Sequence, residues 1–258
     1  MDVTLDHIEF SHGETPLIQD LSCCFSQGKF HAVLGPNGSG KTTLLDLIAG
    51  FYTPRKGQVL LANTPVPQWN KPALARHLTR VSQNERINFP FTVEEVVMMG
   101  RHPHIPRFSH PRAMDYDQVD AVMELTEISE MRHRPITELS GGEQQRCIFA
   151  RALCQDTPIL LLDEAFSNMD IHHTLSMLSR VKETVALQKK TVIAVIHDLN
   201  LAASHADEIL FLKQGRILAQ GPTDQVLTRD ILQQTFNIHT QVEFNAHVQA
   251  KQIYYKPL

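Results

Sequence analysis

A glycine-rich string with the spacing G-x-x-x-x-G-K-T is the feature that most restricts the fold of this 258-residue chain. It runs from Gly35 to Thr42, after the apolar stretch 30–34 and before the helix-like stretch 43–49. A phosphate-binding loop requires this order of strand, glycine loop and helix. The glycines let successive N–H groups face phosphate oxygens, and the helix adds the positive end of its dipole. Taken alone, a string this short has a second interpretation, a chance glycine-rich turn before a helix.

This loop predicts a set of nucleotide contacts. Lys41 is expected to reach the β- and γ-phosphates of a nucleotide, and Thr42 to place its hydroxyl on Mg²⁺. The expected phosphate-binding residues are Gly35, Pro36, Asn37, Gly38, Ser39, Gly40, Lys41, Thr42 and Thr43.

A second apolar run, 158–162, ends in the two carboxylates Asp163 and Glu164. A continuous apolar run of this kind indicates a buried parallel strand, and ligands bind at the carboxyl end of such strands. Asp163 is expected to hold Mg²⁺ through its water shell, and Glu164 to orient and polarise the attacking water. The alternative is that both acids begin a solvated loop.

These segments, in this order, resemble the ATP-binding subunit of an ABC transporter, and the resemblance extends over nearly the whole chain. Its most specific part is L-S-G-G-E-Q-Q-R at Leu139 to Arg146, which matches the signature sequence of the family. The resemblance implies an α/β fold of the P-loop NTPase ABC ATPase type, with a β-rich N-terminal part and an inserted α-helical subdomain. It also implies ATP and Mg²⁺ as cofactors, and ATP hydrolysis coupled to transmembrane transport.

The resemblance assigns further residues to the ATP site. Ser140, Gly141 and Gly142 are implied to complete the ATP site of a partner subunit, so that two ATP molecules lie within a head-to-tail homodimer. Gln83 looks like the Q-loop glutamine that senses Mg²⁺ and the γ-phosphate. His197 looks like the switch histidine that contacts the γ-phosphate, although a histidine at a strand end is often an ordinary surface residue. The implied catalytic residues are Lys41, Gln83, Glu164 and His197, and the implied metal-binding residues are Thr42, Gln83 and Asp163.

Two positions depart from the pattern of the family. Where most members have E-P-T-S-A-L-D, this chain has E-A-F-S-N-M-D from Glu164 to Asp170, which keeps Ser167 and Asp170 at the ends of the D-loop. Asp170 is therefore included among the cofactor-binding residues. Where the family has an aromatic residue that stacks on adenine, this chain has His12, with Phe10 two residues away on the same strand face. We expect His12 to fill this role, with Phe10 as the alternative.

The whole chain, 1–258, is expected to form a single ABC ATP-binding domain. Its RecA-like core is expected over about 1–83 and 146–258, and its helical subdomain over about 84–145, which contains stretches of helical periodicity. A hairpin is expected within 209–218, followed by a short helix that Thr223 could cap.

Composition and charge narrow the classes of function. The formal charge is −4, from 24 basic and 28 acidic residues, and the chain contains no block of like charges. No nucleic-acid partner is therefore expected. The sequence has no apolar run of about eighteen residues and no signal-peptide pattern. We expect a peripheral protein on the cytoplasmic face of the bacterial inner membrane, which reaches the membrane through its partners.

The type of cargo is indicated only by resemblance. The string N-F-P-F-T-V-E-E-V-V at 88–97, followed by G-R-H-P-H at 100–104, looks like the ATPases of type II bacterial importers for haem, ferric siderophores and vitamin B12. Trp69, the string K-P-A-L-A-R at 71–76 and the tail from Phe236 to Leu258 look most like the haem (hemin) importers. The implied partners are two transmembrane permease subunits and, indirectly, a periplasmic substrate-binding protein. Siderophore or vitamin B12 uptake is the alternative.

A soluble ABC ATPase that acts on DNA or ribosomes is an alternative from another class. Repair members insert a long coiled coil between phosphate loop and signature, whereas the gap here is about a hundred residues. Translation members have two cassettes in one chain, and this chain has one. A non-catalytic regulatory subunit is disfavoured because Lys41, Asp163, Glu164 and His197 are all present.

The 14 histidines are scattered along the chain. The adjacent pair His172 and His173 is expected on a helix, where neighbouring side chains point to different faces. The sequence therefore favours a surface helix over a metal site at this pair.

Overall fold

The structure, a computed structural model, describes residues 1–83, 85–167 and 169–255. The chain divides into two compact units. Unit 1 consists of Met1–Trp69 and Thr184–Leu258, and unit 2 consists of Asn70–Glu183.

Unit 1 is rich in strands. In its N-terminal segment the elements are β1 (Val3–His12), β2 (Thr15–Phe25), β3 (Phe30–Leu34), α1 (Lys41–Ile48), β4 (Lys56–Leu61), β5 (Thr64–Pro65) and the 3-10 turn η1 (Val66–Gln68). In its C-terminal segment they are β8 (Thr191–Val195), α7 (Leu199–His205), β9 (Glu208–Lys213), β10 (Arg216–Pro222), α8 (Thr223–Val226), α9 (Arg229–Phe236), β11 (Thr240–Asn245) and β12 (Ala250–Tyr255).

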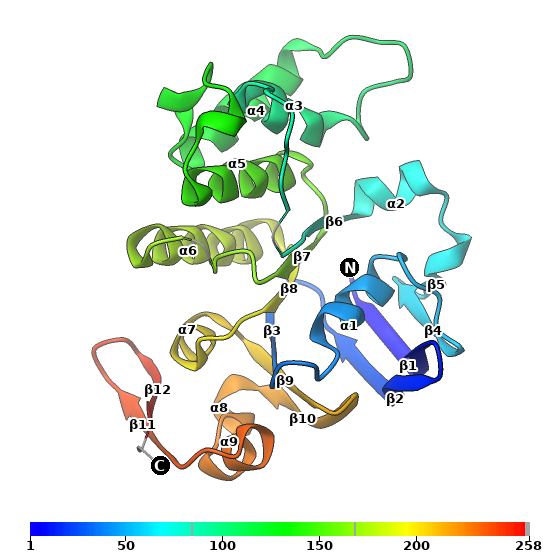
Figure 1. Ribbon diagram of the computed structural model, residues 1–258, viewed down its shortest axis with the longest axis vertical. Coiled ribbons are helices and arrows are strands. Elements are labelled where there is room, and N and C mark those ends of the chain that lie inside the picture. Colours follow the sequence, from blue (N-terminus) through cyan, green and yellow to red (C-terminus); the bar gives the residue numbers. More distant parts are fainter. Residues whose placement is uncertain (84, 168, 256–258) are drawn as a thin grey trace. The chain divides into compact units, whose positions relative to one another are not determined.

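An antiparallel sheet in unit 1 has the strand order β2-β1-β4-β5 (Figure 1). Val3 and Leu5 are buried, and so are Ile8 and Phe10, because alternate residues of a strand face the same side. The alternation shifts by one residue at the irregularity between Leu5 and Ile8. Phe10 pairs with Ile18 across the β1–β2 hairpin. This register places the last residues of β1 beside Ile18, which adjoins Gly40 of the glycine loop.

A mostly parallel group of strands, in the order β10-β9-β3-β8, forms the core of unit 1. All residues of β3 and β8 are buried, as their unbroken apolar runs predict. The two strands are parallel, and Val33 is opposite Val195. Their carboxyl ends therefore lie at the same edge, where β3 continues into the glycine loop and α1 (Figure 1) and β8 continues to His197.

The Asn200 side chain of α7 hydrogen-bonds to the C-terminal β11–β12 hairpin. The amide nitrogen of Asn200 donates to the Ile253 carbonyl oxygen at 3.3 Å, and the Ile253 N–H donates to the Asn200 amide oxygen at 2.7 Å. The predicted tail to Leu258 is described as far as Tyr255, and residues 256–258 lie outside the described part.

Unit 2 is mostly helical. Its elements are α2 (Lys71–His77), β6 (Leu78–Val81), α3 (Val93–Met98), η2 (Met99–Arg101), α4 (Ala113–Leu125), η3 (Ser129–Met131), η4 (Ile136–Glu138), α5 (Gly141–Cys154), β7 (Ile159–Asp163) and the start of α6 (Ile171–Gln188), whose last residues belong to unit 1. Strands β6 and β7 are parallel, with Val81 opposite Leu162. Both strands therefore end at the same edge.

The α/β class with a β-rich N-terminal part is confirmed. Helices α3 and α4 lie inside the segment 84–145, while α5 begins there and continues to Cys154, so the subdomain bounds stay a prediction. The β9–β10 hairpin forms as expected, but Thr223 is the first residue of α8 and its hydroxyl donates to the Ala206 carbonyl oxygen at 2.6 Å instead of capping α8. Among the helices that the structure describes, none is both long and apolar enough to cross a lipid bilayer.

Candidate functional site

The glycine loop of unit 1 makes a tight turn between β3 and α1. Gly40 has φ +103°, a conformation that residues with a Cβ rarely adopt, and a Cβ there would lie 2.8 Å from the Ile18 side chain. Helix α1 begins at the next residue, Lys41. The loop glycine thus both permits the turn and lets β2 approach the helix start.

Lys41 folds back over the loop. Its Nζ donates to the carbonyl oxygens of Gly35 at 2.8 Å and Pro36 at 2.9 Å, and only 6% of the residue is exposed. The Ser39 hydroxyl oxygen is buried and has no hydrogen-bond partner among the described residues. Because buried hydroxyls are nearly always paired, this one suits a ligand with acceptor oxygens. A phosphate group has such oxygens. Thr42, next to Lys41, is exposed.

Three aromatic side chains form a cluster at the end of β1. The rings of Phe10 and Tyr52 are stacked with centroids 5.1 Å apart, and the His12 ring meets both edge-on at 5.0 and 5.2 Å. Phe10 is 7% exposed, Tyr52 is 40% exposed and His12 is exposed. Since Phe10 pairs with Ile18, which adjoins Gly40, the cluster stands on the hairpin that borders the glycine loop.

His197 is exposed and lies two residues after the end of β8. The Asp198 carboxylate accepts from the N–H groups of Asn200 at 2.8 Å and Leu201 at 3.0 Å. Asp198 therefore caps α7 and fixes the turn that carries His197. The parallel register of β3 and β8 brings this turn to the same strand edge as the glycine loop.

In unit 2, two interactions organise the ends of β6 and β7. Asp163 is fully buried, and its carboxylate accepts from an Arg80 guanidinium nitrogen at 2.9 Å. The Gln83 side-chain nitrogen donates to the Glu164 carboxylate at 2.6 Å. The structure thus brings Gln83 together with Glu164.

Glu164 has φ +52°, which is uncommon for a residue other than glycine. This left-handed conformation costs roughly 1–2 kcal/mol for an L-residue. Strained backbone of this kind is concentrated at functional sites, where the surrounding structure holds it in place. The conformation turns the chain sharply at the end of β7 and leaves the carboxylate partly exposed.

Ser140 forms a capping box at the start of α5. Its backbone N–H donates to the Glu143 carboxylate at 2.7 Å, and its hydroxyl accepts from the Glu143 N–H at 3.4 Å. Hydrogen bonds from the Ser140 side chain and backbone hold the pKa of the Glu143 carboxyl below its usual value. Ser140 and Gly141 are exposed, and a Cβ at Gly141 would meet no described atom within 4 Å. An anion can therefore approach the N–H groups of the first turn, assisted by the helix dipole.

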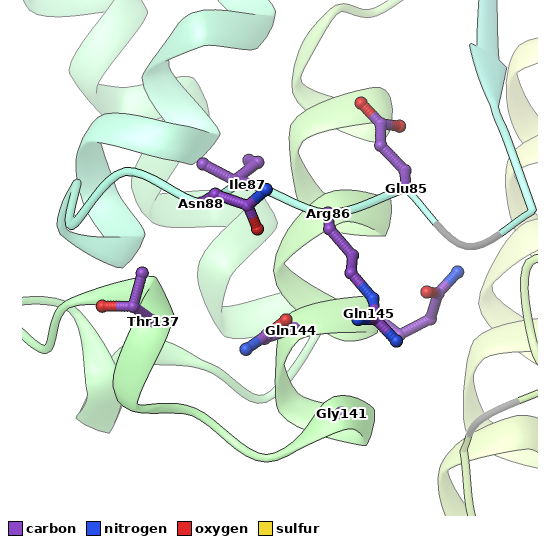
Figure 2. A pocket seen from close by; sticks show the side chains of 8 residues that line it. All are labelled: Glu85, Arg86, Ile87, Asn88, Thr137, Gly141, Gln144 and Gln145. Carbon is purple, nitrogen blue, oxygen red and sulfur yellow. The ribbon is translucent and has the colours of Figure 1, made fainter.

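A pocket of about 360 Å³ lies beside this first turn (Figure 2). Figure 2 shows segment 85–88 on one side and the start of α5, with Gly141, on the other. The lining residues are Glu85, Arg86, Ile87, Asn88, Thr137, Gly141, Gln144 and Gln145. The Gln145 side-chain nitrogen also donates to the Ala165 carbonyl oxygen at 2.9 Å. This bond connects α5 to the residue that follows Glu164.

Asp170 is exposed and caps the beginning of α6. Its carboxylate accepts from the His173 N–H at 2.9 Å, and this bond lowers the pKa of the Asp170 carboxyl. Ser167, at the other end of the D-loop, is also exposed. Asn168 lies outside the described residues.

Two site residues were not found from the sequence. Tyr52 comes from the loop after α1, and no motif signals that it joins Phe10 and His12. Arg80 did offer a signal, because a charged residue within the strand-like run 78–82 needs a buried partner. That partner is Asp163, from another strand.

The chain is similar in sequence and in structure to several known proteins. A family model described as ABC transporter matches residues 18–167. A hemin import ATP-binding protein of Escherichia coli O157:H7 is 37% identical over 237 residues, which cover 89% of this chain and 90% of that protein. A cobalamin import ATP-binding protein of Halobacterium salinarum is 38% identical over 94% of this chain, but the chain spans only 60% of that protein. A chain of a solved metal-chelate type ABC transporter, in an inward-facing conformation, matches with a TM-score of 0.83 at 26% identity, over 99% of this chain and 96% of that chain.

Proposed function

Because the chain belongs to the ABC transporter family, we propose that it is the ATP-hydrolysing subunit of a bacterial import complex. The whole chain then acts as one ATP-binding domain, with a helical subdomain over about 84–145. The observation that carries the proposal is the hydrogen bond between Gln83 and Glu164, in a family member that also has a complete glycine loop. A carboxylate oriented in this way is suited to act as a general base on water.

In the proposed reaction, the glycine loop binds the phosphates of ATP. Lys41 exchanges its carbonyl partners for the β- and γ-phosphate oxygens, which are stronger acceptors because they are charged. Glu164 orients the water that attacks the γ-phosphate, and Gln83 holds Glu164 in place. His197 stabilises the charge that develops on the γ-phosphate.

We propose that Thr42, Gln83 and Asp163 bind Mg²⁺. The donor set fits this ion, because a hydroxyl, an amide oxygen and a carboxylate are the hard oxygen ligands that Mg²⁺ prefers. Arg80 keeps the buried Asp163 carboxylate oriented. When bound, the ion supplies positive charge against the β- and γ-phosphates.

We propose that two copies of the chain form a head-to-tail homodimer. Ser140, Gly141 and Gly142 of one copy then contact the ATP of the other, and Asp170 lies in the same interface. The support is the start of α5, which is exposed and capped by Ser140. Its first N–H groups can bind an anion, and a Cβ at Gly141 would meet no described atom within 4 Å. Closure on ATP and opening after hydrolysis provide the motion that drives transport.

Segment 85–91 is proposed to receive the permease. Phe89 is 61% exposed, and its ring lies 4.5 Å from that of Phe91. Next to these rings, segment 85–88 lines the pocket of Figure 2. An exposed aromatic ring beside a half-buried one, next to a pocket, suits a helix from another protein. Binding to two permease subunits would hold the chain on the cytoplasmic face of the inner membrane, with a periplasmic binding protein on the other side.

Haem is the cargo that we propose, with cobalamin as the alternative. The hemin import relative has nearly the length of this chain and is 37% identical, which supports haem. The cobalamin import relative has a similar identity, 38%, and supports the alternative to the same degree. A ferric siderophore is a third choice, suggested by the sequence resemblance.

The experiment is reconstitution with the membrane protein that co-purifies with this chain. ATP hydrolysis in proteoliposomes is measured with the periplasmic binding protein loaded with haem, cobalamin or a ferric siderophore. We expect haem to stimulate hydrolysis and the other two to leave it at the basal rate. Stimulation by cobalamin alone would exclude haem as the cargo and leave the proposed import function in place. Co-purification with ribosomes or DNA, and not with a membrane protein, would contradict both the cargo and the import function.

The aromatic cluster predicts a specific effect on nucleotide affinity. His12→Ala should weaken ATP binding by about tenfold, because stacking on a base contributes roughly 1–3 kcal/mol, whereas His12→Phe should retain it. Tyr52→Ala should have a smaller effect, since Tyr52 supports Phe10 and His12 from the side. Titration with ATP and with inorganic triphosphate is the measurement. Triphosphate binding should be the same in all variants, and a loss there would contradict a role at the base.

A further inference from the structure

An unexpected cluster of metal-ligating side chains lies at the start of α6 in unit 2. Glu127, His172 and His173 each offer a ligand atom, and these atoms lie within 4.8 Å of one another. The His173 Nδ1 atom is 3.6 Å from a Glu127 carboxylate oxygen, and the two imidazole rings have centroids 5.3 Å apart. The sequence favoured a surface helix whose neighbouring histidines diverge. Both residues do lie on the partly exposed helix α6, but a ring nitrogen of each is within 4.8 Å of a Glu127 carboxylate oxygen.

Backbone conformation explains this convergence. Glu127 has φ +56° in the turn after α4, and its side chain is held by the Ser176 hydroxyl, which donates to it at 3.2 Å. Ser176 lies one turn along α6 from His172 and His173. The turn after α4 therefore presents a fixed carboxylate to the first turn of α6.

Asp170 supplies a second carboxylate behind the cluster. It lies 3.8 Å from the His173 Nε2 atom, on the opposite side of the ring from Glu127. Histidines that ligate metals usually direct their other ring nitrogen to a carboxylate, which fixes the ring and raises its basicity. The His173 Nε2 atom has such a carboxylate nearby, although at 3.8 Å it is beyond hydrogen-bond distance. The buried Nδ1 atom of His173 has no hydrogen-bond partner among the described residues.

We propose that Glu127, His172 and His173 bind a divalent transition-metal ion of the Zn²⁺ type, with water in the remaining position. Two ligand atoms in a tetrahedral zinc site lie roughly 3.4 Å apart, given bonds of about 2.0–2.2 Å. The measured 3.6 Å between His173 and Glu127 is close to this value. Imidazole ligands select Zn²⁺, Ni²⁺ or Cu²⁺ over Mg²⁺, so this site is chemically different from the nucleotide-bound metal.

The electrostatic surroundings also suit a cation. A pocket of about 660 Å³ adjoins His173, and four carboxylates line it together with two arginines. The charged lining residues are Glu124, Glu127, Glu130, Glu143, Arg134 and Arg146. A bound ion would connect the turn after α4 to the start of α6, and so fix the segment that carries Asp170.

The test uses the full chain, stripped of metal with EDTA and kept free of nucleotide. Zn²⁺ is titrated by calorimetry, and Co²⁺ is substituted to record its ligand-field absorption. We expect one strong site per chain, weakened at least about tenfold in His172→Ala, His173→Ala and Glu127→Gln. Asp170→Asn keeps an acceptor for the helix cap and should weaken the site less. His133→Ala is the matched control, because His133 is 84% exposed, lies in unit 2 and is outside the cluster.

Thermal unfolding without metal shows whether each variant is folded. In the unaltered chain the melting temperature should rise with Zn²⁺, and in His172→Ala it should not. His172 is exposed, so this variant remains informative if His173→Ala fails to fold. The proposal is overturned if the unaltered chain binds no Zn²⁺, if the three ligand variants bind it equally well, or if His133→Ala loses as much affinity as they do.

Discussion

Glu164→Gln should reduce ATP hydrolysis by at least about 100-fold, the usual contribution of a general base, while ATP still binds. The structure gives the reason for this separation. Gln83 donates to Glu164 at 2.6 Å, and the amide oxygen of a glutamine can accept the same bond. Glutamine also fits the left-handed backbone at this position about as well as glutamate does. The substitution therefore removes basicity and leaves shape unchanged.

Two measurements separate binding from chemistry in this variant. Single-turnover hydrolysis of radiolabelled ATP should be lost, whereas equilibrium titration with ATP should give an affinity close to that of the unaltered protein. Because the proposed dimer opens only after hydrolysis, size-exclusion chromatography with ATP should show a persistent dimer. Glu183→Gln is the control, since Glu183 is an exposed residue of α6 that pairs with Arg180. Normal turnover by Glu164→Gln would exclude Glu164 as the base.

The parts of the site that lie close together in the sequence could be predicted. The loop from Gly35 to Thr42 and the capped start of α5 are local, because each is encoded by a motif and its flanking apolar pattern. The position of Asp163 and Glu164 at the carboxyl end of a strand could also be predicted, since the apolar run 158–162 indicates a buried parallel strand. The nucleotide roles of these residues stay predictions until variants are measured.

The parts that were missed depend on distant residues. Tyr52 joins Phe10 and His12 only through the packing of the loop after α1 against β1. The Arg80 and Asp163 pair depends on the register of β6 with β7. Neither register nor loop placement follows from periodicity, because periodicity gives the face of a residue and not its neighbour across the sheet.

The histidine pair lies on a partly exposed helix, as the sequence predicted, but the rule about neighbouring helical residues gave no sign of the carboxylate close to both rings. Adjacent helical residues do diverge, by roughly 100° around the axis. However, Glu127 approaches the first turn of α6 from outside the helix, where both rings can reach it. Its position is fixed by a left-handed residue after α4 and by Ser176, and neither is visible in the spacing of the histidines.

Lys41→Ala should lose nucleotide binding while the protein stays folded. Truncating one partner of a buried, hydrogen-bonded charge pair costs at least about 2 kcal/mol, which is about thirtyfold in Kd. Folding should suffer little, because Lys41 places a positive charge at the N-terminus of α1, where the helix dipole is unfavourable to it. Alanine is also the residue with the highest helix propensity.

The melting temperature of Lys41→Ala without ATP should therefore equal or exceed that of the unaltered chain, while the stabilisation that ATP adds should disappear. Lys189→Ala is the matched control, since Lys189 precedes β8 and so lies at the end of that strand opposite to the glycine loop. It should retain the full ATP-induced shift. An unchanged ATP-induced shift in Lys41→Ala would show that the lysine does not contact the phosphates. A lower melting temperature without ATP would instead show that its bonds to Gly35 and Pro36 hold the loop together in the absence of nucleotide.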